Sequence, residues 1–264
     1  MGKLVTFWSP YTGKSKVTST VCAVAAAFGM QYPEIEVAVS HTNPNSTDLE
    51  ERLDYRMKSE EKQELYETSG LSSMTLNYMQ AVLTSEKIRR CSIPLFMKSL
   101  HLFPGVGKKE LSEALLFRLI TEYLAEEFAV VFLDLENGEK ELSIRLMEKA
   151  DLIVLVLPQY PFMKENFFNI GGGVLREKDC FILLGGYLEQ SKYSKKYLER
   201  RYPDKTMELG VIPENTGYFD AMADGKVLDF FLKNQCARKK EENYEFIVQA
   251  KKAAEGIRKK LFFS

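Results

Sequence analysis

Short apolar runs recur along the chain and alternate with longer stretches in which apolar residues are spaced three and four apart. Several runs are hydrophobic at both odd and even positions, as expected for strands of a parallel sheet that helices cover on both faces. We predict strands at residues 4–8, 35–39, 100–103, 130–133, 152–157, 181–184 and 207–212.

Helical spacing is clearest in four stretches, residues 111–125, 139–149, 194–201 and 243–261. Strands that alternate with helices predict an α/β protein with a doubly wound, mostly parallel sheet and helices on both faces. Such a sheet binds its ligand at the carboxyl ends of the strands. No internal repeat, low-complexity tract or linker interrupts the pattern, so we expect a single domain over residues 1–264.

Residues 48–94 form a charged, methionine-containing stretch that fits the strand pattern poorly. We predict helices that cover one edge of the sheet. The alternative is that their charged faces contact a partner protein, although such faces are usually solvated surface.

Charge balance narrows the classes of partner. Lys and Arg number 36 and Asp and Glu 37, which gives a net charge of -1. No overall field therefore recruits nucleic acid or an anionic membrane.

Four cysteines, Cys22, Cys91, Cys180 and Cys236, lie far apart and beside apolar residues, which indicates reduced thiols rather than a disulfide framework. No apolar run approaches the roughly 18 residues of a membrane span, and the N-terminus lacks a cleavable signal pattern. We therefore expect a cytoplasmic protein.

The first strand leads into a small polar loop and then into an alanine-rich helix, the order that nucleotide-binding proteins use. Backbone N–H groups and the positive end of a helix dipole favour an anion at such a point. The P-loop pattern is G-x-x-x-x-G-K-[ST]. Reading Gly13, Lys14 and Ser15 as its end leaves Trp8 at the first glycine and starts the helix too late.

A second register fits better. Thr18 and Ser19 then supply the hydroxyl positions, and the helix follows at once. In this register Lys16 stands at the second glycine and Val17 at the lysine that neutralises phosphate charge.

With this register the chain resembles the MinD/ParA group of deviant-Walker P-loop ATPases, whose loop reads Lys-Gly-Gly-X-Gly-Lys-Thr-Thr before an alanine-rich helix. Residues 128–159, FAVVFLDLENGEKELSIRLMEKADLIVLVLPQ, resemble the family's second acidic strand, the helix after it and the following strand. Residues 209–231, LGVIPENTGYFDAMADGKVLDFF, are similar to its proline loop and the next helix, near the adenine. These motifs stand in the family's order and span nearly the whole chain.

The resemblance implies a nucleotide site and places its residues. Gly13 matches the first loop glycine, Thr12 stands at the signature lysine that reaches across a dimer, and Val17 replaces the second lysine. Lys14 and Lys16 either supply a displaced positive charge or are solvated loop lysines. The nucleotide-binding residues expected are Thr12, Gly13, Lys14, Ser15, Lys16, Val17, Thr18, Ser19, Pro213 and Asn215.

Asp134 matches the family's magnesium-linked aspartate, and Thr18 is its expected partner in holding the metal. An acid that closes a buried strand costs free energy unless an ion, water or hydroxyl meets it. The alternative is that Asp134 caps the following turn together with Glu136 and Asn137. The cofactors implied by the resemblance are ATP and Mg²⁺.

Residues 40–43, Ser-His-Thr-Asn, occupy the place of an Asp-X-Asp that orients the attacking water in the family. His41 either accepts a proton or is a hydrogen-bonding loop residue. Phosphoryl transfer depends on charge stabilisation and nucleophile positioning, so the loss of both lysines and this carboxylate predicts slow or absent hydrolysis.

Asn215 is the candidate for a contact with the base edge, with Pro213 and Glu214 shaping its loop. Its alternative is an ordinary turn asparagine. Two histidines and unpaired cysteines give no zinc pattern. Gly171, Gly172 and Gly173 are interpreted as a plain loop rather than a second phosphate site.

Residues 239–262 predict an amphipathic C-terminal helix with lysines and arginines off its apolar face. We expect this helix to dock on the domain. The alternative is a weak basic-apolar membrane contact through its KKLFF end, as in some MinD relatives.

Two functions follow from the resemblance and its departures. The first is a cytoplasmic ATP-binding homodimer that positions or assembles a larger machine, most similar to the TadZ/CpaE branch, which localises pilus or secretion apparatus. The second is a non-catalytic scaffold that kept the fold and lost nucleotide. Protein partners are expected in both cases, and the sequence shows no sign of nucleic-acid binding.

Overall fold

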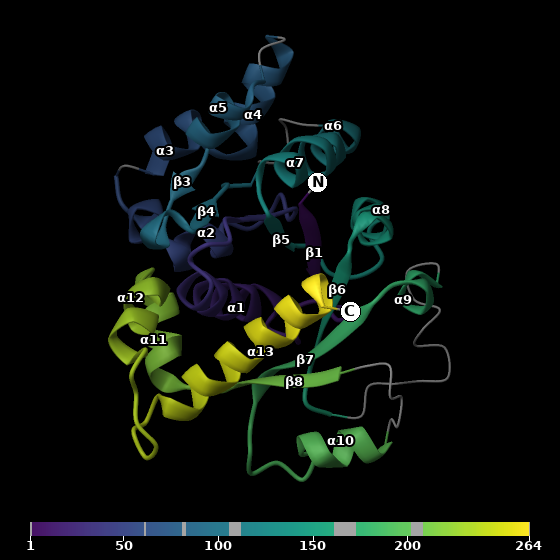
Figure 1. Cartoon of the computed structure of the whole chain (residues 1–264), viewed down its shortest axis with the longest axis vertical. Helices are drawn as coiled ribbons and strands as arrows, with labels where there is room; N and C mark the ends of the chain where they lie inside the picture. Colours follow the sequence, from purple (N-terminus) through teal and green to yellow (C-terminus); the bar gives the residue numbers. More distant parts are fainter. Residues whose placement is uncertain are drawn as a thin grey trace.

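The computed structural model describes residues 2–60, 62–80, 83–105, 112–160, 173–201 and 208–263 (Figure 1). One continuous sheet runs through this part of the chain, with the strand order β3-β4-β2-β5-β1-β6-β7-β8. Neighbouring strands pair in parallel except β3, which runs antiparallel to β4 at one edge. The strands are β1 Lys3–Trp8, β2 Val37–His41, β3 Ile93–Pro94, β4 Leu100–Leu102, β5 Val130–Asp134, β6 Leu152–Leu157, β7 Cys180–Tyr187 and β8 Glu208–Pro213.

The predicted α/β class and mostly parallel sheet are confirmed. All seven expected strands are present, with shifts of one to three residues at some ends. Residue 207, where the last was expected to begin, lies outside the described residues. Strand β3 was not predicted, because two residues that include a proline carry no strand pattern.

Helices cover both faces of the sheet. One face carries α1 Val17–Gln31, α2 Asp48–Leu53, α11 Thr216–Asp224, α12 Val227–Asn234 and α13 Tyr244–Phe262. The other carries α4 Gly70–Met79, α5 Ser85–Arg90, α6 Glu113–Arg118, α8 Glu141–Lys149, α9 Val174–Glu177 and α10 Lys195–Arg201.

Strand β1 shows why the apolar runs lack alternation. Val5 and Phe7 pack in the core on the α1 side, whereas Leu4 and Trp8 pack in the core on the opposite side. Because both faces of the strand are covered, both parities must be hydrophobic.

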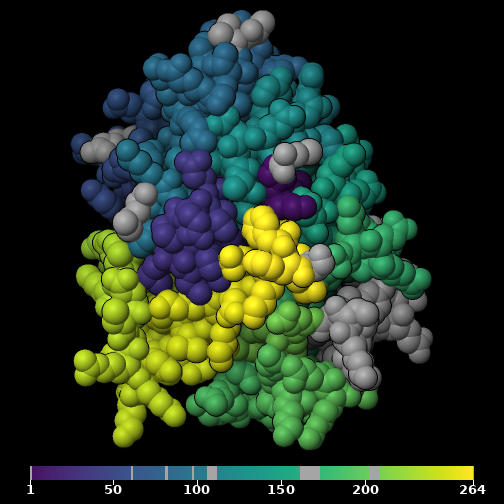
Figure 2. Space-filling model, viewed as in Figure 1, coloured from purple at the N-terminus to yellow at the C-terminus, as the bar shows by residue number. Residues whose placement is uncertain are grey.

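Helix α1 is buried on nearly all sides, between the sheet and α13. Many of the buried side chains of α1 are small, including Ala23, Ala25, Ala26 and Ala27, each at most 1% exposed. Helix α13 contacts α1 and also buries small residues, Ala250, Ala253, Ala254 and Gly256, the last of them against Phe181 of β7. Figure 2 shows the end of α13, in yellow, lying against α1, in purple.

The described part of residues 48–90 is mostly helical, as predicted, and covers the β3–β4 edge, whereas Ile93–Pro94 at the end of the predicted helical stretch is strand β3 (Figure 1). Besides α2, α4 and α5 it contains the 3₁₀ turn Tyr55–Lys58 and α3 Lys62–Thr68.

Two helix predictions need correction. The C-terminal helix begins at Tyr244, not at residue 239, because the polar residues before it form turns. The stretch predicted as one helix at 111–125 is α6, the π-helical segment Leu119–Leu124 and α7 Ala125–Glu127. Residue 111 lies outside the described residues.

An edge-to-face aromatic cluster packs between the central strands β1 and β5 and helix α1. The ring of Phe132 on β5 lies 5.5 Å from that of Phe7 and 5.3 Å from that of Phe28 on α1. We expect Phe132→Ala to lower the free energy of unfolding by about 3–5 kcal/mol, because it leaves a cavity that the packed core cannot fill. Urea denaturation measures this.

Phe263→Ala is the matched control, since that ring is 68% exposed. It should change stability by less than about 0.5 kcal/mol. Equal effects of the two substitutions would show that the aromatic cluster does not anchor the fold.

Candidate functional site

Loops from neighbouring strands meet at the carboxyl end of β1. The Trp8 indole N–H donates to the carbonyl of Gly138, 3.0 Å away, in the loop after β5. The backbone N–H of Gly138 donates to the carbonyl of Ser9, and the N–H of Ser9 donates to Oδ1 of Asn137. The loop after β1 is therefore fastened at its start.

The rest of this loop, residues 9–16, contains two residues with left-handed backbone conformations. Gly13 and Lys16 both have left-handed conformations, with φ of 71° and 54°, and the Ser9 and Ser15 hydroxyls lie 2.6 Å apart. Helix α1 begins at the next residue, Val17, so its positive end faces the loop. Left-handed geometry is what a glycine position provides, and Lys16 stands where the second register places that glycine.

Strand β7 passes directly beside the loop. A Cβ at Gly185 would lie 2.3 Å from the Ser15 carbonyl oxygen, so only glycine fits there. Sequence reasoning missed this residue. The signal was present, since two glycines end an otherwise apolar strand.

The two loop lysines have different surroundings. The Lys16 ammonium pairs with the Glu214 carboxylate in the loop after β8, and Gly186 makes room for that contact, because a Cβ there would lie 2.9 Å from Cδ of Lys16. Lys14 is exposed, as is Thr12. Val17 is buried in the core at 3% exposure. No charge therefore stands at the lysine position of the second register.

Asp134 ends β5 with its carboxyl buried, 6% exposed. Burial raises the pKa of this carboxyl to about 6, against the opposing effects of a hydrogen bond from Thr18 and the charges of His41 and Arg52. In the alternative, Asp134 caps the following turn together with Glu136 and Asn137. The Asn137 side chain instead accepts a hydrogen bond from the Ser9 N–H.

The Asp134 and Thr18 oxygens suit Mg²⁺, which prefers hard oxygen ligands and keeps phosphates and water in its shell. Among the described residues no three acids, histidines or cysteines gather as a metal site of their own. A metal here would thus depend on the oxygens of a bound nucleotide.

His41 ends β2 and is hydrogen-bonded to a buried acid. Its Nε2 lies 2.7 Å from Oε1 of Glu50, which also accepts the Gly105 N–H at 2.9 Å. Burial alone would lower the pKa of His41, but the charge and hydrogen bond of Glu50, together with the Asp134 charge and a backbone hydrogen bond, outweigh it and raise the pKa. This geometry favours a hydrogen-bonding role over that of a free proton acceptor.

A cavity of about 420 Å³ lies between the ends of β7 and β8 and the first half of α13, with Pro213 and Asn215 in its wall. Oδ1 of Asn215 accepts the Tyr218 N–H at 2.7 Å, and its amide nitrogen donates to Asn243 at 3.0 Å. Asn215 thus caps α11 in this structure. The charged side chains of the cavity wall are mainly acidic, Glu189, Glu214, Glu242 and Glu245 against Lys195 and Lys252.

The C-terminal helix presents its apolar face to the core rather than to solvent. Phe246, Ile247 and Ile257 are at most 3% exposed, whereas Phe262 and Phe263 at its end are 44% and 68% exposed. Within the described ranges, no helix has both the length and the apolar character needed to cross a membrane. Of the glycine run, Gly173 precedes α9, and Gly171 and Gly172 lie outside the described residues.

Comparisons with known proteins identify the fold. Neither protein-family models nor curated proteins give a match. Among solved structures, the chain is similar to a ParA family ATPase from Chlorobium tepidum, with a TM-score of 0.69 and 15% identity over 97% of this chain and 99% of that one.

It is also similar to the septum site-determining protein MinD from Pyrococcus horikoshii, complexed with Mg-ADP, with a TM-score of 0.66 and 12% identity over 98% of both chains. The MinC:MinD cell division protein complex from Aquifex aeolicus gives 0.63 and 12% identity over 97% of this chain and 96% of that one. The chain therefore has the MinD/ParA P-loop NTPase fold.

The buried Asp134 predicts a pH-dependent stability. Its pKa is about 6 in the folded protein and 3.8 for a free carboxyl. The folded state binds the extra proton, so stability falls as pH rises through this window and stays lower above it. We expect Asp134→Asn to match the wild type at pH 4 and to exceed it by about 2 kcal/mol at pH 8.

Urea denaturation across that pH range measures the difference. Asp151→Asn, which changes a half-exposed acid paired with Lys3, is the control and should not reproduce this pH dependence. A constant offset between Asp134→Asn and wild type at all pH values would contradict the raised pKa.

Proposed function

We propose that this protein binds ATP, hydrolyses it slowly or not at all, and acts in the localisation or assembly of a larger complex. The observation that carries the proposal is the loop after β1. Its left-handed Gly13 and Lys16 lead into the buried helix α1, and Thr18 in the first turn of that helix faces Asp134. This arrangement suits phosphate together with a metal.

Each part of the nucleotide has a matching region. Backbone N–H groups of residues 12–19 would hold the phosphates, and Thr18 and Asp134 would hold Mg²⁺, which supplies positive charge to the phosphate oxygens. The base would enter the cavity beside Pro213 and Asn215. The acidic wall of that cavity disfavours phosphate and suits the amino group of a base.

Slow hydrolysis is proposed on chemical grounds. Thr12 and Val17 stand at the two lysine positions, and the end of β2 offers His41, already bonded to Glu50, instead of a carboxylate. Charge stabilisation and placement of the attacking water supply most of the catalysis of phosphoryl transfer. Both are weakened here.

The cellular role is proposed from the fold and rests on analogy. The similar structures include a ParA family ATPase and a MinD in complex with MinC, a protein partner. We therefore propose a homodimer with protein partners in the cytoplasm. The altered phosphate loop points to the TadZ/CpaE branch and to pilus or secretion apparatus as the machine. Burial of the apolar face of α13 favours docking of this helix over membrane contact.

A second function, a scaffold that no longer binds nucleotide, is favoured by one contact. Lys16 is the charged residue of this loop whose backbone is left-handed. Its ammonium group already pairs with the Glu214 carboxylate, so it is not available to an incoming anion. The two functions differ in whether the wild-type protein takes up ATP.

Calorimetric titration with ATP and Mg²⁺ tests the first function. We expect measurable binding that Thr18→Ala weakens more than Lys14→Ala does, because Thr18 faces the metal-binding carboxyl and Lys14 is exposed. Absence of both heat and thermal stabilisation at millimolar nucleotide would leave the scaffold. Equal effects of the two variants would count against the second register.

Phosphate release by the purified protein tests turnover separately. We expect rates well below the roughly 1–100 s⁻¹ of kinases. Rates in that range would contradict the loss of catalytic charge.

A further inference from the structure

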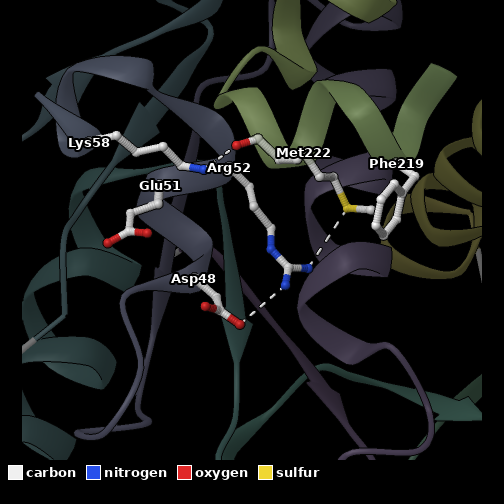
Figure 3. A pocket seen from close by; sticks show the side chains of 7 residues that line it. Asp48, Glu51, Arg52, Lys58, Phe219 and Met222 are labelled. Carbon is white, nitrogen blue, oxygen red and sulfur yellow. Dashed lines mark hydrogen bonds and ion pairs between the residues drawn. The ribbon is translucent and has the colours of Figure 1, made fainter. Parts of the chain in front are cut away.

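A second cavity, of about 210 Å³, opens between α2 and α11. Figure 3 shows Arg52 reaching from α2 into this space, with Asp48 below it and Met222 and Phe219 opposite on α11. Lys58 and Glu51 complete the charged part of the wall.

The Arg52 guanidinium has weak partners for its bonding capacity. One nitrogen donates to Oδ2 of Asp48 at 3.1 Å, and another lies 3.8 Å from the Met222 sulfur. A guanidinium carries five N–H donors, and a thioether is a poor acceptor. With its side chain 27% exposed at the edge of a cavity, Arg52 is poised for a further anionic acceptor.

Met222 connects Arg52 to the phosphate loop. The same sulfur accepts the Ser19 hydroxyl at 3.0 Å, and Ser19 lies in the first turn of α1. The Tyr218 hydroxyl donates to the Ser19 carbonyl at 2.6 Å, which holds α11 against that turn. The guanidinium is therefore two contacts from the end of the helix where an anion is favoured.

Its charge already acts on groups of the site. Burial raises the pKa of the Asp134 carboxyl and of the Cys22 thiol inside α1, and the Arg52 charge opposes both increases. Three other cations of this region have partners of their own, Lys16 with Glu214, Lys58 with the carbonyl of Ala223 and Lys62 with Glu51, whereas Lys14 is exposed on the loop.

We propose that Arg52 binds the phosphate groups of the nucleotide and supplies the positive charge that the loop after β1 has lost at Thr12 and Val17. The inference rests on the proposed function, nucleotide binding at this loop. Arginine suits the task, because its planar donor fork binds phosphate in a bidentate manner. Asp48 competes with that phosphate for the guanidinium.

This competition gives opposite signs for two substitutions. Arg52→Gln removes the charge and should weaken ATP binding about tenfold, the size of one charge-assisted contact. Asp48→Asn releases the guanidinium and one negative charge, and should strengthen ATP binding severalfold. Arg52→Lys should recover part of the loss.

Calorimetric titration of the full chain with ATP and with AMP, both with Mg²⁺, measures these effects. The loss in Arg52→Gln should be larger for ATP than for AMP, which brings fewer charges to the site. The matched controls are Arg90→Gln and Glu86→Gln on α5, an exposed pair with the same spacing of four residues, and they should leave both affinities unchanged.

Four outcomes would overturn the proposal. If Arg52→Gln binds ATP with wild-type affinity, Arg52 does not contact the phosphates, although the protein still binds nucleotide. Equal losses for ATP and AMP, or weaker binding in Asp48→Asn, would show that Arg52 supports the fold of α2 instead. Absence of ATP binding by the wild type would reject the proposed function together with this inference. Melting temperatures identify variants that unfold. If Arg52→Gln unfolds, the ATP affinity of Asp48→Asn, which keeps Arg52, tests the proposal by itself.

Discussion

The position of the candidate site depends on the close packing of α1 between the sheet and α13. A helix with Ala23, Ala25, Ala26 and Ala27 on its buried faces lets the sheet and a second helix approach together. Larger side chains at these positions would have to displace one layer or the other. Because α1 has no freedom to shift, the turn that precedes it is fixed as well, and Lys16 is held in a conformation that costs a lysine about 1–2 kcal/mol.

The proposal of nucleotide binding without rapid hydrolysis rests on the electrostatics around that turn. The backbone of the loop and the buried Asp134 keep the features that favour an anion with a metal. Three side chains carry the proposal of slow hydrolysis: Val17 is a buried apolar residue, Lys16 pairs with Glu214, and His41 is hydrogen-bonded to Glu50. Under the proposed function, the backbone of this loop would hold the phosphates and Arg52 would supply the positive charge that Thr12 and Val17 lack.

Much of the fold could be predicted from the sequence, because strands covered on both faces leave uninterrupted apolar runs. The short β3 could not, since a two-residue strand leaves no period. Asp134 stood out because an acid at the end of a buried strand is costly. Glu50, Gly185 and Arg52 were missed, because their significance lies in contacts with His41, Ser15 and Met222 that only the packed structure brings together.

The contact between α1 and α13 also orders the events of folding. Helix α1 spans Val17–Gln31 and its partner spans Tyr244–Phe262, so nearly all of the described chain separates them. A nascent chain that has made only the first strand and helix lacks the surface that closes the apolar side of α1, and such exposed surface is prone to aggregate. The loop after β1 is made long before α13, yet the packing that fixes it is complete only after α13 has emerged from the ribosome.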